Sequence, residues 1–159
     1  MQILGEFRRR DGRIERRFTK SERKMIANLA GGLVEALDRA DELASYDDPV
    51  LQRLLPAAAP TDPDASAEFA SATRGRLAEA KAAGARRLQV DLEAAPGGTV
   101  RLDDQDAVVW LKALGDLRLA LAERVGFDAL QGGRTPQALI YGWLTWLQGS
   151  LVEALDPET

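Results

Sequence analysis

The chain has 159 residues, of which 45% are hydrophobic and 29% are charged, a composition typical of a soluble globular protein. It contains neither cysteine nor histidine. This excludes disulfides, thiolate nucleophiles and the imidazole that most often shuttles protons or binds metal ions. These features favour a single domain over residues 1–159 that binds rather than catalyses, so we expect no catalytic residue, metal or cofactor.

The net charge is −4, but it is unevenly spread along the chain. Residues 1–24 hold nine Lys or Arg against four Asp or Glu, which gives +5 there and −9 over the remainder. No apolar run approaches the roughly 20 residues that cross a bilayer, and the N-terminus lacks the apolar stretch of a secretory signal. We therefore expect a cytoplasmic protein that does not contact membranes.

Residues 1–18 are predicted to form a β-hairpin. The pair Asp11-Gly12 is typical of a two-residue type I′ turn, which needs positive φ at both positions. With the turn centred there, Arg8 lies opposite Glu15 and Glu6 lies opposite Arg17, two pairs of opposite charge. The other face is then apolar, apart from one arginine, and holds Ile3, Phe7, Arg16 opposite Phe7, Ile14 and Phe18.

Helical periodicity predicts four principal helices, over residues 20–45, 64–95, 103–125 and 136–155. Thr19 and Glu22 have the spacing of a capping box at the start of the first helix. A short helix is expected over 48–55, with Asp48-Pro49 at its beginning. A Pro- and Ala-rich loop is expected over 57–65. Residues 88–94 also alternate in polarity, which leaves a strand open as an alternative there.

The sequence "TVRL" at residues 99–102 is predicted to be a strand that widens the hairpin, because a two-stranded hairpin alone is marginal in water. Gly31-Gly32, inside the first helix, indicates a closely packed neighbour or a bend. The acidic run at 103–106 is interpreted as helix capping rather than as a metal site. The expected fold class is mainly α: a bundle of about four principal helices with a small N-terminal β-hairpin, possibly three-stranded with residues 99–102.

The last predicted helix carries the aromatic residues that raise the question of function. Tyr141, Trp143 and Trp146 flank an apolar stripe that includes Leu144 and Leu147. Large aromatic side chains are usually well buried, so one interpretation is that the rings fill the core. The alternative is that they anchor a second copy of the chain or another protein, and we take these three residues as candidates for partner binding.

Arginines provide the second set of candidates. Those in residues 8–24 can contact nucleic-acid phosphates, although pairing across the hairpin explains part of the cluster. Arg9, Arg10 and Arg13 are secondary candidates for partner binding. Arg118 lies in a helix that is apolar nearly all round, so we expect a structural ion pair. The alternative for Arg118 is a bidentate clamp on a carboxylate of a ligand or partner.

Several segments together carry a family resemblance: "MIANLAGGLVEALD", then "DPVLQRLLP", then the C-terminal pair "WLKALGDLRLALAERVG" and "YGWLTWLQGSLVEAL". In this order they resemble an actinobacterial family, formerly a domain of unknown function and now named for the oxidative-stress transcription regulator AosR. The resemblance extends from the "RRRDGR" hairpin to the end and leaves only the 57–65 loop unmatched. Gly115 stands where the family commonly has Asn, and Gly142 where an acidic residue often follows the Tyr.

The resemblance implies a small cytoplasmic regulator that binds a protein, either a stress-type sigma factor or an RNA polymerase component. The genes of the family usually neighbour that of the ClpS adaptor, which implies an adaptor role in ClpS-dependent proteolysis as one alternative. Direct nucleic-acid binding by the basic N-terminal segment is another. Thiol-based redox sensing, suggested for this kind of regulator, cannot operate in this chain because it has no cysteine.

Overall fold

The computed structural model describes residues 5–55, 63–131 and 133–156. Within these ranges the strands are β1 (Arg8–Arg10), β2 (Arg13–Arg17) and β3 (Thr99–Leu102). The long helices are α1 (Lys20–Asp38), α3 (Pro63–Ala94), α4 (Asp104–Val125) and α6 (Pro136–Leu155). The shorter elements are the 3₁₀ helices η1 (Leu43–Asp47) and η2 (Pro96–Gly98) and the helices α2 (Pro49–Leu54) and α5 (Phe127–Gln131).

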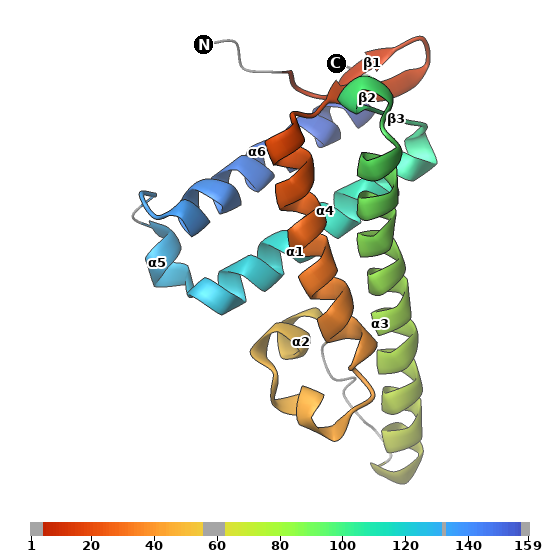
Figure 1. The fold of residues 1–159 in the computed structure, drawn as a ribbon. Helices are drawn as coiled ribbons and strands as arrows, with labels where there is room; N and C mark the ends of the chain where they lie inside the picture. Colours follow the sequence, from red (N-terminus) through yellow and green to blue (C-terminus); the bar gives the residue numbers. More distant parts are fainter. Residues whose placement is uncertain (1–4, 56–62, 132, 157–159) are drawn as a thin grey trace.

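The predicted fold class is confirmed: four long helices form a bundle, and a small sheet lies at one end of it (Figure 1). Helix α1 packs along α3, while α4 contacts α3, α2 and α6. The sheet covers the end where α1, α3 and α6 approach one another (Figure 1). None of the helices in the described ranges is long and apolar enough to span a bilayer.

The sheet has the predicted turn and register. Asp11 and Gly12 have φ values of 52° and 80°, as a type I′ turn requires. Arg8 lies opposite Glu15 in the antiparallel ladder, and β3 pairs with the free edge of β2. Glu6 precedes β1, so the ladder does not reach the predicted Glu6–Arg17 pair. Ile3 lies outside the described residues.

The inner face of the sheet joins the helices through aromatic packing. Phe7, Phe18 and Trp110 form a cluster with ring centroids 5.7–6.1 Å apart, and all three side chains are buried. The indole Nε1 of Trp110 donates a 2.7 Å hydrogen bond to Asp91 of α3. This cluster therefore ties the hairpin to α4, and α4 to α3, around one core.

Helix α1 ends at Asp38, well before the predicted end at residue 45. Hydrogen bonds from nearby Ser45 and from distant Arg74 replace those that a longer helix would make. The Ser45 hydroxyl hydrogen-bonds the carbonyls of Ala40 and Glu42, and Arg74 of α3 also donates to the Ala40 carbonyl. These bonds satisfy the backbone carbonyls without the helix continuing, because a serine hydroxyl competes with helical N–H groups for nearby carbonyls. The predicted capping box of Thr19 and Glu22 is present at the other end of α1.

The remaining bounds lie close to expectation, with two differences. Helix α3 begins at Pro63, inside the predicted 57–65 loop, and residues 57–62 of that loop lie outside the described residues. Helix α5 was not predicted. Residues 88–94 are helical rather than extended: Leu88 and Leu92 are buried one turn apart, and Val90 is 59% exposed between them.

The close neighbour expected at Gly31-Gly32 is α3. A Cβ placed on Gly31 would lie 3.2 Å from the side-chain nitrogen of Gln89, which donates a hydrogen bond to the Ala27 carbonyl. A Cβ on Gly32 would meet the Arg124 side chain at ordinary contact distance, 3.5 Å. Gly31 therefore lets α1 approach α3 closely, whereas Gly32 faces α4, and α1 remains one continuous helix.

Candidate functional site

Helix α6 exposes an apolar surface. Its inner side is formed by Leu144, Leu147 and Leu151, all with no exposed area. On its outer side Leu139 is 62% exposed and Val152 is 49% exposed. Glu153 is the single charged residue among the twenty of this helix. Helix α6 thus has fewer charged residues on its outer side than a surface helix normally has.

The candidate tryptophans adjoin this outer surface. Trp143 is half-buried against the core, whereas Trp146 is 37% exposed. Both rings lie within cation–π distance of the Arg16 guanidinium, at 5.6 and 5.8 Å. The two tryptophans are thus brought together around one cation of β2, and Trp146 presents part of its ring to solvent.

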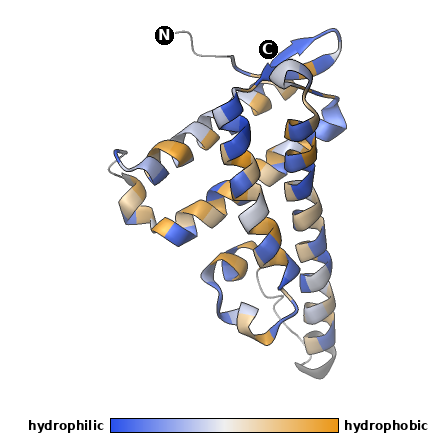
Figure 2. Ribbon diagram, viewed as in Figure 1, coloured by the Kyte–Doolittle hydropathy of each residue, from blue (hydrophilic) through white to orange (hydrophobic). Residues whose placement is uncertain are grey.

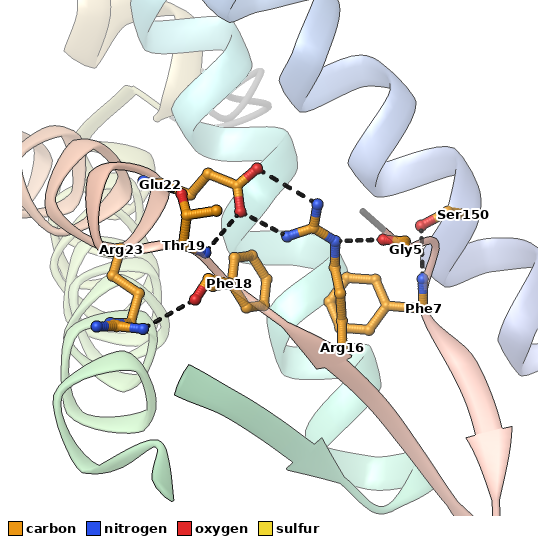
Figure 3. A network of polar contacts seen from close by, with 8 residues as sticks. All are labelled: Gly5, Phe7, Arg16, Phe18, Thr19, Glu22, Arg23 and Ser150. Carbon is orange, nitrogen blue, oxygen red and sulfur yellow. Dashed lines mark hydrogen bonds and ion pairs between the residues drawn. The ribbon is translucent and has the colours of Figure 1, made fainter. Parts of the chain in front are cut away.

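Arg16 was not among the candidate residues predicted from the sequence. Its side chain is only 2% exposed, and its Nε donates a 2.6 Å hydrogen bond to the Gly5 carbonyl (Figure 3). Its two terminal nitrogens bond the two carboxylate oxygens of Glu22 at 3.1 and 3.4 Å. The Phe18 ring lies 4.5 Å below the guanidinium.

The Arg16–Glu22 pair joins three parts of the fold. The Glu22 carboxylate also accepts from the Thr19 backbone, so the ion pair includes the cap of α1 (Figure 3). Just before β1, the Phe7 backbone donates to the Ser150 hydroxyl of α6. The sheet, the start of α1 and α6 therefore meet in one polar network beneath the aromatic rings.

Tyr141 belongs to a different environment. Its ring lies 5.1 Å from the Arg118 guanidinium, and its hydroxyl accepts a 3.3 Å hydrogen bond from the same group. Five residues separate Tyr141 from Trp146, which places them about 140° apart around a helix. The structure therefore does not gather the three predicted aromatic residues into one patch.

Arg118 was predicted to form an ion pair. Within the described residues its hydrogen-bond partners are instead neutral: the side-chain oxygen of Gln148 at 2.5 Å and the Tyr141 hydroxyl. Its Nε is buried and has no hydrogen-bond partner there. Gly115 contributes to this arrangement, because a Cβ there would lie 3.1 Å from the Gln148 side-chain nitrogen.

A groove between α3 and α4 has a volume of about 940 Å³. Its lining is mainly apolar, and its carboxylate is Asp116, which accepts a 2.7 Å bond from Lys81. Burial raises the pKa of Asp116 above its ordinary value, and the bond from Lys81 partly offsets this. Across the described residues, no three Asp or Glu side chains are placed to hold a metal ion.

The acidic run at 103–106 serves the helix, as predicted. The Asp103 carboxylate accepts from the Asp106 backbone and caps α4. Asp106 also pairs with Arg87 of α3, and Asp104 pairs with Arg9 of β1. Each carboxylate of this run thus has a structural role.

The candidate arginines of the hairpin lie on two faces. Arg9 is opposite Ile14, on the side of the helices, where it pairs with Asp104 and reaches the Ala154 carbonyl. Arg10 and Arg13 lie directly opposite each other on the outer face, and both are exposed. The structure therefore keeps Arg10 and Arg13 together and separates Arg9 from them.

Comparison with known proteins places the chain in a family. Residues 4–155 match the family described as "Domain of unknown function (DUF2017)". Relatives named "Oxidative stress regulator AosR", from Mycobacterium bovis and from two strains of Mycobacterium tuberculosis, are each 32% identical to it over 184 residues. These alignments cover 92% of this chain and 84% of each relative. No solved structure matches it. The chain therefore belongs to the DUF2017, or AosR-type, family.

Proposed function

We propose that this protein is a non-enzymatic cytoplasmic regulator of a stress response, and that it acts by binding a transcription protein through α6. The relatives named oxidative stress regulators support the regulatory role. The family resemblance favours a stress-type sigma factor or an RNA polymerase component as the partner. The absence of His and Cys, and a groove between α3 and α4 whose carboxylate is already paired, favour binding over catalysis.

The observation that carries this proposal is the outer surface of α6. Leu139 and Trp146 lie about 20° apart around α6 and form one exposed apolar patch, and Val152 lies about 120° from Trp146. With Glu153 as its only charged residue, this helix exposes more apolar surface than a helix that meets only water normally does. Gly142 and Gly149 add no bulk to this helix, since a Cβ on either would meet nothing within 4 Å. A partner can therefore approach the backbone of α6 closely.

Trp146 is suited to anchor such a partner. Tryptophan is enriched among the residues that dominate protein interfaces. Here its ring is also held against the Arg16 guanidinium, which is itself fixed by Glu22 and Gly5. A ring already positioned in the free protein loses little conformational freedom on binding, which favours affinity.

The lack of cysteine shapes the proposed role. A regulator without thiols cannot form the disulfide or sulfenic acid by which oxidants are commonly sensed. We therefore place oxidant sensing in the partner protein, with this chain supplying a constant binding surface. Addition of peroxide to this chain alone should then leave its affinity for a reduced partner unchanged.

The test uses purified sigma factors and RNA polymerase core from the source organism, passed over the immobilised full chain. We expect one of them to bind, and the substitutions Leu139→Glu and Trp146→Ala each to weaken that binding at least tenfold. Leu139→Glu is the sharper variant, because Leu139 is 62% exposed and its loss should leave the fold intact. Thermal melting followed by circular dichroism reports on the fold.

Phe69→Ala is the matched control, since Phe69 is an equally exposed apolar residue of α3. It should leave partner binding unchanged. Mass measurement by light scattering addresses the alternative partner, a second copy of the chain. If the chain is a dimer and Leu139→Glu converts it to a monomer, the α6 surface binds a second copy of the chain rather than a transcription protein. Absence of any binding, or equal losses in the α6 and Phe69 variants, would contradict the proposal.

A further inference from the structure

The outer face of the sheet gathers arginines from all three strands. Residues that lie opposite each other in an antiparallel ladder share a face, and Arg8, Glu15 and Arg101 form such a row. Alternate residues along each strand share that face as well. The complete outer face therefore holds Arg8 and Arg10 of β1, Arg13, Glu15 and Arg17 of β2, and Thr99 and Arg101 of β3. All five arginines are exposed.

This face carries more positive charge than its own carboxylate can balance. Glu15 bonds to both Arg10 and Arg101, at 3.6 and 3.3 Å. Arg13 and Arg17 have no carboxylate partner within the described residues. Arg10 and Arg13 lie directly opposite each other, an arrangement of like charges that destabilises a sheet. An external anion would relieve this repulsion.

The composition of the face indicates the class of anion. It holds no apolar side chain, whereas the centre of a protein–protein interface is depleted in charge and enriched in aromatic and apolar groups. Attraction to a nucleic-acid backbone needs no apolar contact, because neutralised phosphates release bound counterions. The guanidinium group also matches phosphate oxygens in a bidentate geometry. Figure 2 colours most of the hairpin as hydrophilic.

We propose that the outer face of the sheet binds the phosphate backbone of duplex nucleic acid without reading its sequence. The inference is independent of the α6 surface, which lies on another element and differs in chemistry. The uneven charge along the chain agrees with this assignment. Residues 1–24, which include the hairpin, carry +5 whereas the remainder carries −9, so the hairpin segment attracts nucleic acid more strongly than the rest of the chain does.

The test measures fluorescence anisotropy of a labelled 20-base-pair DNA duplex against increasing full-length protein, at several salt concentrations. We expect binding at low salt that weakens steeply as salt rises. If all five arginines contact phosphates, the slope of log K against log salt reaches about −4.5, since each contact contributes about −0.9. A duplex of scrambled sequence should bind equally well.

The decisive variant combines Arg13→Gln with Arg17→Gln, because both side chains are exposed and neither has a carboxylate partner to lose. We expect at least tenfold weaker binding at low salt and a slope smaller in magnitude by about 2, as two lost phosphate contacts require. Arg76→Gln combined with Arg134→Gln is the control, since it removes the same charge from exposed positions away from the sheet. The control should keep most of the affinity and the full slope.

Three outcomes would overturn the proposal. The first is no anisotropy change at low salt up to high protein concentration. The second is equal loss of affinity in the sheet variant and the control variant. The third is displacement of DNA by polyglutamate at equal charge concentration, which would assign the face to acidic protein segments instead.

Discussion

Arg16 shows how one residue can join several elements. Its position in β2 puts its guanidinium between Phe18, Trp143 and Trp146, among otherwise apolar groups. A buried cation is tolerated only when it is paired and hydrogen-bonded. Glu22 supplies the opposite charge and the Gly5 carbonyl accepts a further hydrogen bond. The same ion pair positions the cap of α1 and the aromatic rings of α6.

Substitution of Arg16 by Met tests this role. Methionine keeps an unbranched stem but leaves the Glu22 carboxylate, 19% exposed, without its cation. We expect Arg16→Met to lower the free energy of unfolding by about 3 kcal/mol, as loss of one partner of a buried pair does. Arg17→Met, on the exposed face, should change it by less than about 0.5 kcal/mol. Urea denaturation followed by far-UV circular dichroism measures both, and similar losses would refute a special role for Arg16.

Asp116 gives a prediction about pH. Burial raises its pKa in the folded state, so the folded protein holds this proton more tightly than the unfolded chain does. Its contribution to stability is therefore greatest at low pH and falls as pH rises from the ordinary Asp range through the raised pKa. The difference in unfolding free energy between the wild type and Asp116→Asn should decrease over this range and then become constant. Denaturant titrations between about pH 3 and 7 measure this difference, and a flat profile would contradict it.

At the scale of elements, the contact between α1 and α3 depends on a side chain of minimal size. Alanine normally favours a helix over glycine by about 1 kcal/mol. Gly75 of α3 has open space around it, so Gly75→Ala should gain much of that amount. The gain in unfolding free energy from Gly31→Ala should be about 1 kcal/mol smaller than that from Gly75→Ala, because the new methyl displaces Gln89 from the Ala27 carbonyl. Chemical denaturation of both variants tests this, and equal gains would show that α1 and α3 adjust freely.

Local sequence signals predicted most elements because their causes are local. The turn at Asp11-Gly12 set the register, and caps such as Thr135 and Asp48 marked the starts of helices. The end of α1 could not be predicted in this way. It depends on Arg74, which lies 34 residues beyond the Ala40 carbonyl to which it donates. Helix ends that are fixed by tertiary hydrogen bonds leave little trace in periodicity.

The candidate site was predictable only where local sequence signals determine its geometry. The register from the turn already put Arg16 opposite Phe7 on the apolar face, so an arginine in an apolar row was the available signal. The neutral partners of Arg118 could not be predicted from the sequence. They depend on how α4 packs against α6, which places Gln148 and Tyr141 beside Arg118. Arg101 joins the outer face only through the pairing of β3 with β2.

At the scale of the whole molecule, one end of the α6 surface lies close to the sheet. The C-terminal half of α6 contacts Phe7, just before β1, through Ser150, and Arg9 of β1 through the Ala154 carbonyl. Residues 25–159 carry −9, and some of their carboxylates, such as Asp104, also lie at this end. If both proposals hold, a protein bound near the C-terminal end of α6 and a nucleic acid bound on the sheet would be held close together.

The order of the strands also affects how the protein is made. β2 ends at Arg17, whereas its neighbour β3 begins at Thr99, after α1 and α3. During synthesis the hairpin emerges from the ribosome first, but its sheet stays incomplete until the third strand arrives. Distant pairings of this kind form late, since the intervening chain must first be ordered. The nascent hairpin therefore lacks its third strand while α1 and α3 are being synthesised, and the sheet is completed only after them.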